Sequence, residues 1–473
     1  MTGAALEKYA HKLVKKIRFR IPDVPGALGQ LASVLGAQNA VLGDIVTEHV
    51  TSNYIIRVIT IFFDTREQCN TALAAVRKLK GYKVLDVEDE VLHIHKGGKV
   101  AMAPRVKVET LSDLRMIYTP GVAQVCHHIA RHPQEAAIYT SIGNTACIVT
   151  NGTAVLGLGN IGVLAAMPVM EGKSLILSRF SGVSCVPLLI DSDKASVIVD
   201  ALAALAKTFS VIMLEDISAP LCFEVEEQLQ KKVSIPVFHD DQHGTAIVVL
   251  SALIKGLSMV GKKKETVKIV MSGAGAAGIA TCKLLLEYGF KNITMCDRNG
   301  AIHIGRDQDM NPYKKEIAKI TNRNNTAGSL AETLKGADVF IGVSSAGLVH
   351  PDMVKTMAKK AIVFGLANPI PEIWPQDALA AGAALAMDGR TINNALAFPG
   401  LIRGAINAGA KHISYAMKFA AAEALASLAG KHDVVPNFMH MAVHEKVAEA
   451  VMAATPPNKE LIPEGGRKEC EAH

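Results

Sequence analysis

The feature that most constrains the fold is a glycine-rich turn in TVKIVMSGAGAAGIATCKLLLEYGFKNITMCDRNG, residues 266–300. It follows the strand-like VKIVM directly and precedes a helix-like run that ends near Gly289. Glycines with GxGxxG spacing permit a tight turn, close approach of backbone to a pyrophosphate and packing of helix on strand, while the helix N-terminus favours negative charge. The sequence therefore predicts a Rossmann-type dinucleotide-binding domain, with cofactor contacts from Gly273, Gly275, Ala276, Ala277 and Gly278.

The acid that follows this turn bears on the choice of dinucleotide. Asp297 ends the second apolar run, nineteen residues after Gly278. A carboxylate there accepts a hydrogen bond from the ribose 2′-hydroxyl and repels a 2′-phosphate, which favours NAD. Arg298 stands beside it and could instead hold a phosphate, so NADP stays open as the alternative.

A second α/β domain is expected upstream of the glycine turn. Apolar strand-like runs alternate there with helices: AVLGLG, SLILSRF, SCVPLLID, SVIMLED and IPVFHDD. This alternation predicts a parallel sheet covered by helices, in which ligands gather at the carboxyl ends of the strands. We place this substrate and metal domain at 105–246 and the Rossmann domain at 247–430, with C-terminal helices that include Tyr415–Leu428.

Two pairs of adjacent acids end apolar runs in the upstream domain. Glu215 and Asp216 end VIMLED, and Asp240 and Asp241 end IPVFHDD about twenty-five residues later. Hard oxygen ligands in a cleft are what Mg²⁺ or Mn²⁺ needs, and no Cys or His cluster has zinc spacing. A single pair would more simply be a solvated turn or a helix cap, but two pairs at equivalent strand ends predict a divalent-cation site.

Two further residues are candidates for proton transfer. Lys173 is expected just before an apolar strand in VMEGKSLIL, and Tyr118 just before a Pro-Gly turn in RMIYTPGVA. A desolvated lysine near a cation can act as a base, and a nearby tyrosine can deliver a proton. Taken singly, a surface lysine and a core tyrosine are the simpler interpretations.

Residues 14–95 form a separate predicted domain. The expected order is strand, helix, strand, strand, helix, strand, with a helix over Arg66–Leu79 and a last strand in YKVLDVEDEVLHIH, which predicts a small ferredoxin-like βαββαβ sandwich. Within it, IPDVPGALGQLASVL resembles the first strand-to-helix turn of ACT domains, which implies a small-molecule effector site; the alternative is an unrelated ferredoxin-like domain that only dimerises. Basic HKGGKVAMAPRVK, residues 95–107, is expected to be a linker.

Composition excludes several classes of protein. The net charge of +6 is spread along the chain, which gives no support for nucleic-acid binding and suits a small anionic substrate. The eight cysteines form no CxxC pair and are expected to be reduced, the N-terminus lacks a signal-peptide pattern, and no apolar run has the length of a membrane span. A cytoplasmic protein without nucleic-acid or membrane partners is expected.

Eight motifs in one order between Leu111 and Leu428 resemble the malic enzymes: YTPGVA, NGTAVLGLGNIG, PVMEGKSLI, LEDISAP, FHDDQHGTA, GAGAAG, LANPIPEI and INNALAFPG. The compact length and the spellings GLGNIG and DDQHGTA resemble the small prokaryote-type branch of that family. The resemblance carries over to individual residues. It implies Glu215, Asp216 and Asp241 as metal ligands, Asp240 as the acid paired with the catalytic Lys173, Tyr118 as general acid, and Asn368 and Asn394 as amides that hold substrate and nicotinamide.

The activity implied by this resemblance is the oxidative decarboxylation of malate to pyruvate. Lys173 would take the C2 hydroxyl proton during hydride transfer, and Tyr118 would protonate C3 after CO₂ leaves. Two alternatives remain at this point: a malolactic reaction that yields lactate without releasing NADH, and a catalytically dead body fused to an ACT-type sensor. A homodimer or homotetramer is expected from apolar surfaces near the first helices of the catalytic body.

Two departures from the family pattern and two histidines complete the predictions. Val155 stands where longer members have a substrate-binding arginine, as in the small branch, and AMDGRTINNALAFPG is a few residues short before its Asn pair. Both concern the rim of the substrate pocket. His239 and His243 are predicted to form structural hydrogen bonds rather than to ligate metal.

Overall fold

The structure is a computed structural model that describes residues 12–155 and 157–455. It divides into two compact units, one up to Ala101 and one from Met102, and each is described by itself. The division falls inside the basic segment 95–107 that the sequence predicts as a linker.

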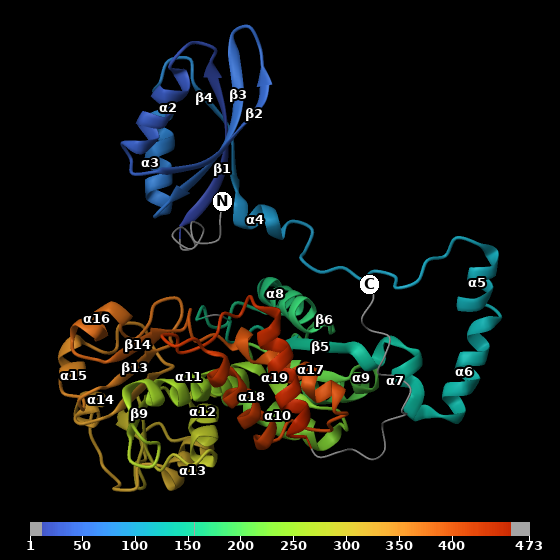
Figure 1. Cartoon of the computed structure of the whole chain (residues 1–473), viewed down its shortest axis with the longest axis vertical. Helices are drawn as coiled ribbons and strands as arrows, with labels where there is room; N and C mark the ends of the chain where they lie inside the picture. Colours follow the sequence, from blue (N-terminus) through green and yellow to red (C-terminus); the bar gives the residue numbers. More distant parts are fainter. Residues whose placement is uncertain (1–11, 156, 456–473) are drawn as a thin grey trace. The chain divides into compact units, whose positions relative to one another are not determined.

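The N-terminal unit is a four-stranded antiparallel sheet with two helices on one face (Figure 1). The chain runs β1 (Leu13–Pro22), α2 (Ala27–Gly36), β2 (Val41–Val50), β3 (Tyr54–Phe63), α3 (Arg66–Arg77) and β4 (Lys83–Asp89), with strand order β2-β3-β1-β4. This is the predicted βαββαβ order. Alternate residues of β1, Ile17, Phe19 and Ile21, are buried against Leu31 and Leu35 of α2, as the period-2 and period-3.6 patterns require.

One prediction for this unit is wrong. The run DEVLHIH does not continue the last strand, because the chain turns into a short helix, α4 (Glu90–His95). The side chain of Asp89 accepts hydrogen bonds from the backbone N–H groups of Val91 and Leu92, which caps the helix and ends the strand.

The second unit begins with α5 (Leu111–Ile117), α6 (Gly121–Arg131) and α7 (Ala136–Tyr139), none of which has a buried residue. Figure 1 shows α5 and α6 projecting away from the sheets that follow. Their substantial contacts are with each other, with α7 and with the turn Pro133–Glu135 between α6 and α7. This pair of helices, residues 111–131, is called the arm below.

A four-stranded parallel sheet follows the arm, with order β6-β5-β7-β8. Its strands are β5 (Thr145–Thr150), β6 (Ser184–Leu189), β7 (Val211–Leu214) and β8 (Val237–His239), and its helices are α8 (Val163–Ser181), α9 (Ala195–Leu205) and α10 (Leu221–Lys232). The runs SCVPLLID, SVIMLED and IPVFHDD contain strands as predicted. The strand β5 was not predicted.

Two of the five expected strands are wrong. The described residues of AVLGLG lie in a loop with an isolated bridge between Val155 and Gly159, and SLILSRF lies inside α8. In α8 the buried residues Ala166, Met170, Ser174 and Leu177 recur every three or four positions. A short apolar run within such a helix cannot be told from a buried strand by its composition alone.

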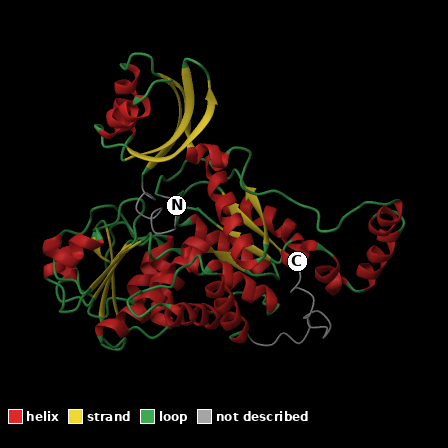
Figure 2. Ribbon diagram, turned by 45° about the horizontal axis from the view of Figure 1, so that its top comes forward, coloured by secondary structure: helices red, strands yellow, loops and turns green. Residues whose placement is uncertain are grey.

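The predicted Rossmann-type sheet is confirmed, with strand order β11-β10-β9-β12-β13-β14. Its strands are β9 (Lys268–Ser272), β10 (Asn292–Asp297), β11 (Gly300–Ala301), β12 (Val339–Gly342), β13 (Ile362–Gly365) and β14 (Leu385–Asp388). All pair in parallel except β11, which forms a hairpin with β10. The helices are α12 (Ala276–Glu287), α13 (Pro312–Ile320), α14 (Leu330–Leu334), α15 (Pro351–Lys355) and α16 (Pro375–Ala380), and Figure 2 shows the strands enclosed by them.

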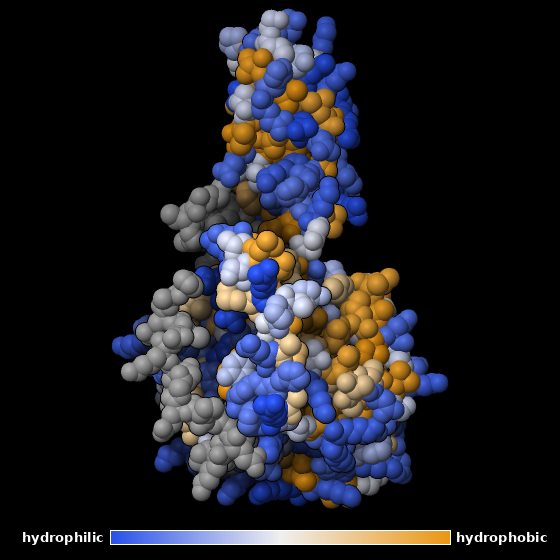
Figure 3. All heavy atoms as spheres, turned by 90° about the vertical axis from the view of Figure 1, so that its right-hand side faces the viewer, coloured by the Kyte–Doolittle hydropathy of each residue, from blue (hydrophilic) through white to orange (hydrophobic). Residues whose placement is uncertain are grey.

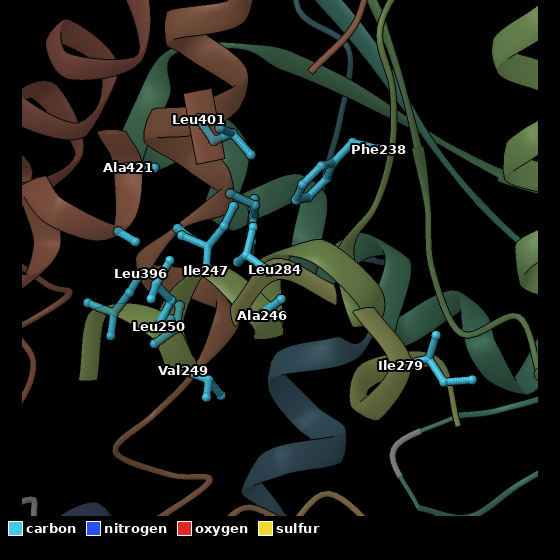
Figure 4. Close-up of a cluster of buried hydrophobic side chains, with 14 of the residues drawn as sticks. Phe238, Ala246, Ile247, Val249, Leu250, Ile279, Leu284, Leu396, Leu401 and Ala421 are labelled. Atoms are coloured by element: carbon cyan, nitrogen blue, oxygen red, sulfur yellow. The ribbon is translucent and has the colours of Figure 1, made fainter. Parts of the chain in front are cut away.

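The helix α11 (Thr245–Val260) lies between the two parallel sheets and joins their cores. Figure 4 shows Ile247 and Leu250 of α11 among Phe238, Leu284 and Leu401, which come from β8, α12 and α17. The last helices, α17 (Phe398–Asn407), α18 (Tyr415–Leu428, as predicted) and α19 (Met441–Ala453), pack on one another, and α11 packs on α18.

One helical stretch of the described residues, Asp240–Val260, is long and apolar enough to cross a membrane. Its most apolar window is 67% buried inside the protein, which is the usual state of a core helix. The stretch is thus weak evidence for a membrane span.

Candidate active site

A cluster of carboxylates lies at the carboxyl ends of β7 and β8. Glu215 and Asp216 follow β7, and Asp240 and Asp241 begin a five-residue π-helical turn, η4 (Asp240–Gly244), directly after β8. Because β7 and β8 are parallel neighbours, the two acidic pairs meet at one edge of the sheet. Ligand oxygens of Glu215, Asp216 and Asp241 lie within 4.8 Å of one another, so the structure brings together the three predicted metal ligands.

Lys173 of α8 enters this cluster and compensates its charge. Its Nζ forms an ion pair with Asp240 and a second, of 3.0 Å, with Oε1 of Glu215. Asp240 is fully buried, which an ionised carboxylate tolerates only with such a partner. Burial disfavours the ammonium of Lys173, but the carboxylates of Asp240 and Glu215 outweigh burial and raise the pKa of Lys173.

The cluster has the oxygen donors and the charge that a divalent cation requires. Oε2 of Glu215 is buried and has no hydrogen-bond partner among the described residues. Burial and the neighbouring carboxylates hold the pKa of Glu215 well above its ordinary value despite Lys173. A cation among these oxygens would compensate the excess negative charge, so the residues present fit Mg²⁺ or Mn²⁺.

The backbone around the cluster is unusual in two places. Asp216 has φ 54°, in the left-handed region that aspartate tolerates better than most residues. Its N–H donates to Oδ2 of Asp241 at 2.8 Å, so the left-handed turn ties the two acidic pairs together. Gly244, at the end of η4, would place a Cβ 2.0 Å from Oδ1 of Asp240 and 3.2 Å from Cβ of Asn394. Asn394 therefore lies against the same turn.

The glycine turn has the geometry that the sequence predicts. Gly273 has φ 109°, and a Cβ on Gly278 would lie 1.9 Å from the carbonyl oxygen of Gly273. A Cβ on Gly275, by contrast, would meet no atom within 4 Å, because the turn is open there. A cavity of about 640 Å³, large enough for part of a dinucleotide, opens beside Gly273 and is also lined by Asp297 and Arg298.

Asp297 is more strongly paired than the sequence predicts. Its carboxylate accepts hydrogen bonds from both terminal nitrogens of Arg306, at 2.9 and 2.5 Å, and from Nζ of Lys314 at 2.8 Å. Burial opposes ionisation, but Arg306 and Lys314 together lower the pKa of Asp297 to about 2. Arg298 is largely exposed and pairs with Asp309 at 3.2 Å. Neither Arg306 nor Lys314 stands in the glycine motif, so the sequence pattern gives no sign of them.

Asn368 lies on the loop after β13, where a second tight contact occurs. A Cβ on Gly157, which has φ 75°, would lie 2.3 Å from the carbonyl oxygen of Asn368. The loop that contains GLGN and the loop that contains LANP are thus in contact. Glu372, which the sequence analysis missed, is buried and accepts hydrogen bonds from the backbone N–H groups of Ser344 and Ala367 at 2.7 and 3.0 Å. It fixes the two loops beyond β12 and β13.

Tyr118 is not brought to this site within one chain. It lies at the C-terminal end of α5 and is 67% exposed, whereas the side chain of Lys173 is only 12% exposed. Figure 1 shows the arm apart from α8, which carries Lys173. The alternative of a core tyrosine is wrong, and the catalytic role of Tyr118 stays a prediction.

The two histidines behave differently from each other. His243 forms structural hydrogen bonds, as predicted: its Nε2 lies 2.9 Å from Oε1 of Glu226. Neither ring nitrogen of His239 has a hydrogen-bond partner among the described residues, and Nδ1 lies 3.7 Å from Oδ2 of Asp241. The predicted hydrogen bond of His239 is therefore wrong.

Two features define the class of protein. A glycine turn with its acid lies at the carboxyl ends of β9 and β10 in a six-stranded Rossmann-type sheet, and a lysine is held by carboxylates that follow β7 and β8. Together they define a dinucleotide-dependent oxidoreductase. Comparison with known proteins identifies the family within this class. Residues 98–198 match the family model of the malic enzyme N-terminal domain, and residues 242–455 match that of the malic enzyme NAD binding domain. The chain belongs to the malic enzyme family, the oxidoreductases that decarboxylate malate.

Individual relatives agree with this assignment. The chain is 42% identical to an NAD-dependent malic enzyme of Geobacillus stearothermophilus over 98% of both chains. It is 47% identical to a bifunctional malic/malolactic enzyme of Bacillus subtilis, over 78% of this chain and 92% of that one. The crystal structure of the NAD-dependent malic enzyme from Thermotoga maritima has a TM-score of 0.74 and 40% identity, and covers 76% of this chain and 98% of that one.

Proposed function

We propose that this chain oxidises and decarboxylates (S)-malate to pyruvate and CO₂ with NAD and a divalent cation. The observation that carries the proposal is Lys173, held by Asp240 and Glu215 beside three converging carboxylates. Glu215, Asp216 and Asp241 would hold Mg²⁺ or Mn²⁺, and the turn 273–278 would hold the dinucleotide. When bound, the cation polarises the C2 oxygen of malate and the nicotinamide accepts hydride from C2.

The chain's own residues handle the protons. A bound cation would compensate the carboxylates that raise the pKa of Lys173. Lys173 can then take the proton of the C2 hydroxyl as the neutral amine, and Asp240 keeps its Nζ aimed at the cluster. After CO₂ leaves, C3 of the product needs a proton, and the hydroxyl of Tyr118 delivers it. Asn394, which lies against the turn η4, orients the substrate, and Asn368 holds the nicotinamide amide.

We propose that Tyr118 acts in the active site of a second copy of the chain. Three observations support this: the arm has no buried residue, Tyr118 is exposed, and apolar side chains of the arm face solvent. The large exposed ones are Leu111, Leu114, Met116, Ile117, Val122 and Val125. Figure 3, viewed from the side on which the arm lies, shows hydrophobic side chains on that surface. A homodimer that exchanges arms would cover them and complete both sites.

Two finer assignments complete the proposal. The cofactor is NAD rather than NADP, because the Asp297 carboxylate at the end of β10 would repel a 2′-phosphate, although Arg306 and Lys314 reduce that repulsion. The N-terminal unit is an ACT-type effector domain of a cytoplasmic enzyme. Its βαββαβ topology and the full-length match to the Geobacillus stearothermophilus enzyme support a shared, separate module.

The test is an absorbance assay for NADH and NADPH with malate and Mn²⁺, in which pyruvate and lactate are also quantified. Wild type, Lys173→Ala and the exposed control Lys194→Ala are compared. Nucleotide reduction matched by pyruvate, lost only in Lys173→Ala, is expected. Lactate without free NADH would instead establish the malolactic reaction, which the Bacillus subtilis relative's name makes the second candidate. No turnover with either nucleotide would refute the proposal.

A further inference from the structure

The turn that carries Asp240 and Asp241 has a second set of contacts, made by its next two residues. Glu226 of α10 is buried, and its carboxylate accepts a hydrogen bond from Nε2 of Gln242 at 3.0 Å. The same carboxylate lies 2.9 and 3.1 Å from Nε2 of His243. The buried Glu226 carboxylate therefore holds two consecutive side chains of η4. Its own helix, α10, supplies no residue to the carboxylate cluster.

Lys418 of α18 determines where the imidazole proton lies. Its Nζ is 3.0 Å from Nδ1 of His243. An ammonium can only donate, so Nδ1 accepts and the single proton of the neutral imidazole is on Nε2, directed at Glu226. The neutral ring of His243 thus separates a buried cation from a buried anion and hydrogen-bonds to both.

Several hydrogen-bond donors stabilise the negative charge of Glu226. Gln230, one turn later on α10, also donates to Oε1 at 3.4 Å. Burial disfavours the carboxylate, but His243 and Lys418 keep the pKa of Glu226 below its ordinary value. An ionised acceptor with several donors makes shorter and stronger hydrogen bonds than a neutral one.

The turn itself needs such an anchor, because its geometry is uncommon. Residues Asp240–Gly244 form a π-helical turn, which is wider than an α-helical turn and recurs at functional sites. The side chain of Asp240, the first residue of the turn, lies so close to Gly244, the last, that a Cβ on residue 244 has no room. A small rotation of η4 would therefore move the Asp240 and Asp241 carboxylates together.

We propose that Glu226 is a positioning residue of this enzyme: through Gln242 and His243 it fixes the turn η4, so that Asp240 meets Lys173 and Asp241 faces the cation. Glu226 itself touches neither substrate nor cation. The inference rests on the proposed cation site. It implies that loss of the Glu226 carboxylate weakens cation binding even when no substrate is present, because outer partners orient the ligands that bind metal.

The test uses Mn²⁺ alone, titrated into the full-length chain without malate or dinucleotide, with free Mn²⁺ followed by electron paramagnetic resonance. The variant is Glu226→Gln, which keeps the shape of the side chain but removes its charge and replaces one acceptor oxygen with an NH2 group that can only donate. Glu224→Gln is the matched control, since Glu224 is an exposed acid on the same helix. The Kd for Mn²⁺ is expected to rise at least about ten-fold in Glu226→Gln and to stay unchanged in Glu224→Gln.

Should Glu226→Gln fail to fold, Gln242→Met removes one of the two donors and keeps the His243 contact. A rise in Kd of about three-fold or more is then expected, below the full effect of Glu226→Gln. Mn²⁺ binding by the wild type with unchanged affinity in a folded Glu226→Gln or Gln242→Met variant would overturn the positioning role and leave the cation site intact. No Mn²⁺ binding by the wild type, or full binding by Asp241→Asn, would overturn the cation site itself.

Discussion

If each active site takes Lys173 from one chain and Tyr118 from another, two inactive variants should restore each other. Tyr118→Phe removes the acid that protonates C3, and Lys173→Ala removes the base. Each change alone is expected to lower kcat by about 10²- to 10⁴-fold, the usual range for a group that transfers a proton.

The magnitude of the restoration follows from the arrangement of the sites. A mixed dimer has one site with both residues intact and one site with neither. Random pairing of equal amounts makes about half of the dimers mixed, so the mixture should reach about one quarter of wild-type activity. Mixed dimers isolated through two different affinity tags after co-expression should reach about one half.

The assay is malate-dependent NADH formation, with subunit composition checked by native mass spectrometry. A control pair, Lys173→Ala with Asp240→Asn, should give no restoration, because both changes fall on the same side of every site. If the mixed Tyr118→Phe and Lys173→Ala dimers were no more active than the single variants, exchange of the arm would be refuted.

Three further predictions concern other parts of the molecule. Gly244→Ala places a Cβ 2.0 Å from Asp240, so kcat should fall by about 10²-fold or more while far-ultraviolet circular dichroism is unchanged; near-normal kcat would contradict the packing. Burial lowers the pKa of Lys418 from 10.5 to about 8. Between pH 8 and pH 10.5 the unfolded chain therefore binds more protons at this lysine than the folded chain does, and the free energy of unfolding of the wild type rises with pH. The stability of Lys418→Met relative to wild type should therefore fall by up to about 3 kcal/mol from pH 7 to pH 11 in urea titrations; a pH-independent difference would count against a buried ammonium. Asp297→Ser leaves Arg306 and Lys314 free to bind a 2′-phosphate, so the ratio of kcat/KM for NADP to that for NAD should rise about ten-fold or more, and an unchanged ratio would exclude Asp297 as the discriminating group.

Local chemistry made part of this molecule predictable from its sequence. The glycine turn needs GxGxxG directly between a strand and a helix, and both Gly273 and Gly278 occupy positions where a Cβ would collide. The two acidic pairs could be brought together because parallel neighbouring strands end at one edge of a sheet. In the first case the constraint acts over a few residues, and in the second it follows from the parallel pairing of β7 with β8.

The remaining features depend on contacts between distant segments. SLILSRF was predicted as a strand because a short apolar run does not show whether it is covered on one side or both, and only the packing of α8 decides this. Glu226 stands among exposed acids in EVEEQ, and its partner His243 is seventeen residues away. The arm looks like any short amphipathic helix pair, and nothing in YTPGVA reveals that Tyr118 lies outside its own chain's site.

The turn η4 continues directly into α11, and both pack against α12, the helix that follows the glycine turn. A cation held by Asp241 would contact η4, and a dinucleotide would contact the N-terminus of α12. Both ligands would therefore act on the packing of η4 and α11 against α12. Any free energy by which one ligand shifts that contact must enter the binding of the other with the same sign and size. The size of this coupling is then a property of the core between the two sites, and substitutions along α11 that touch neither ligand should alter it.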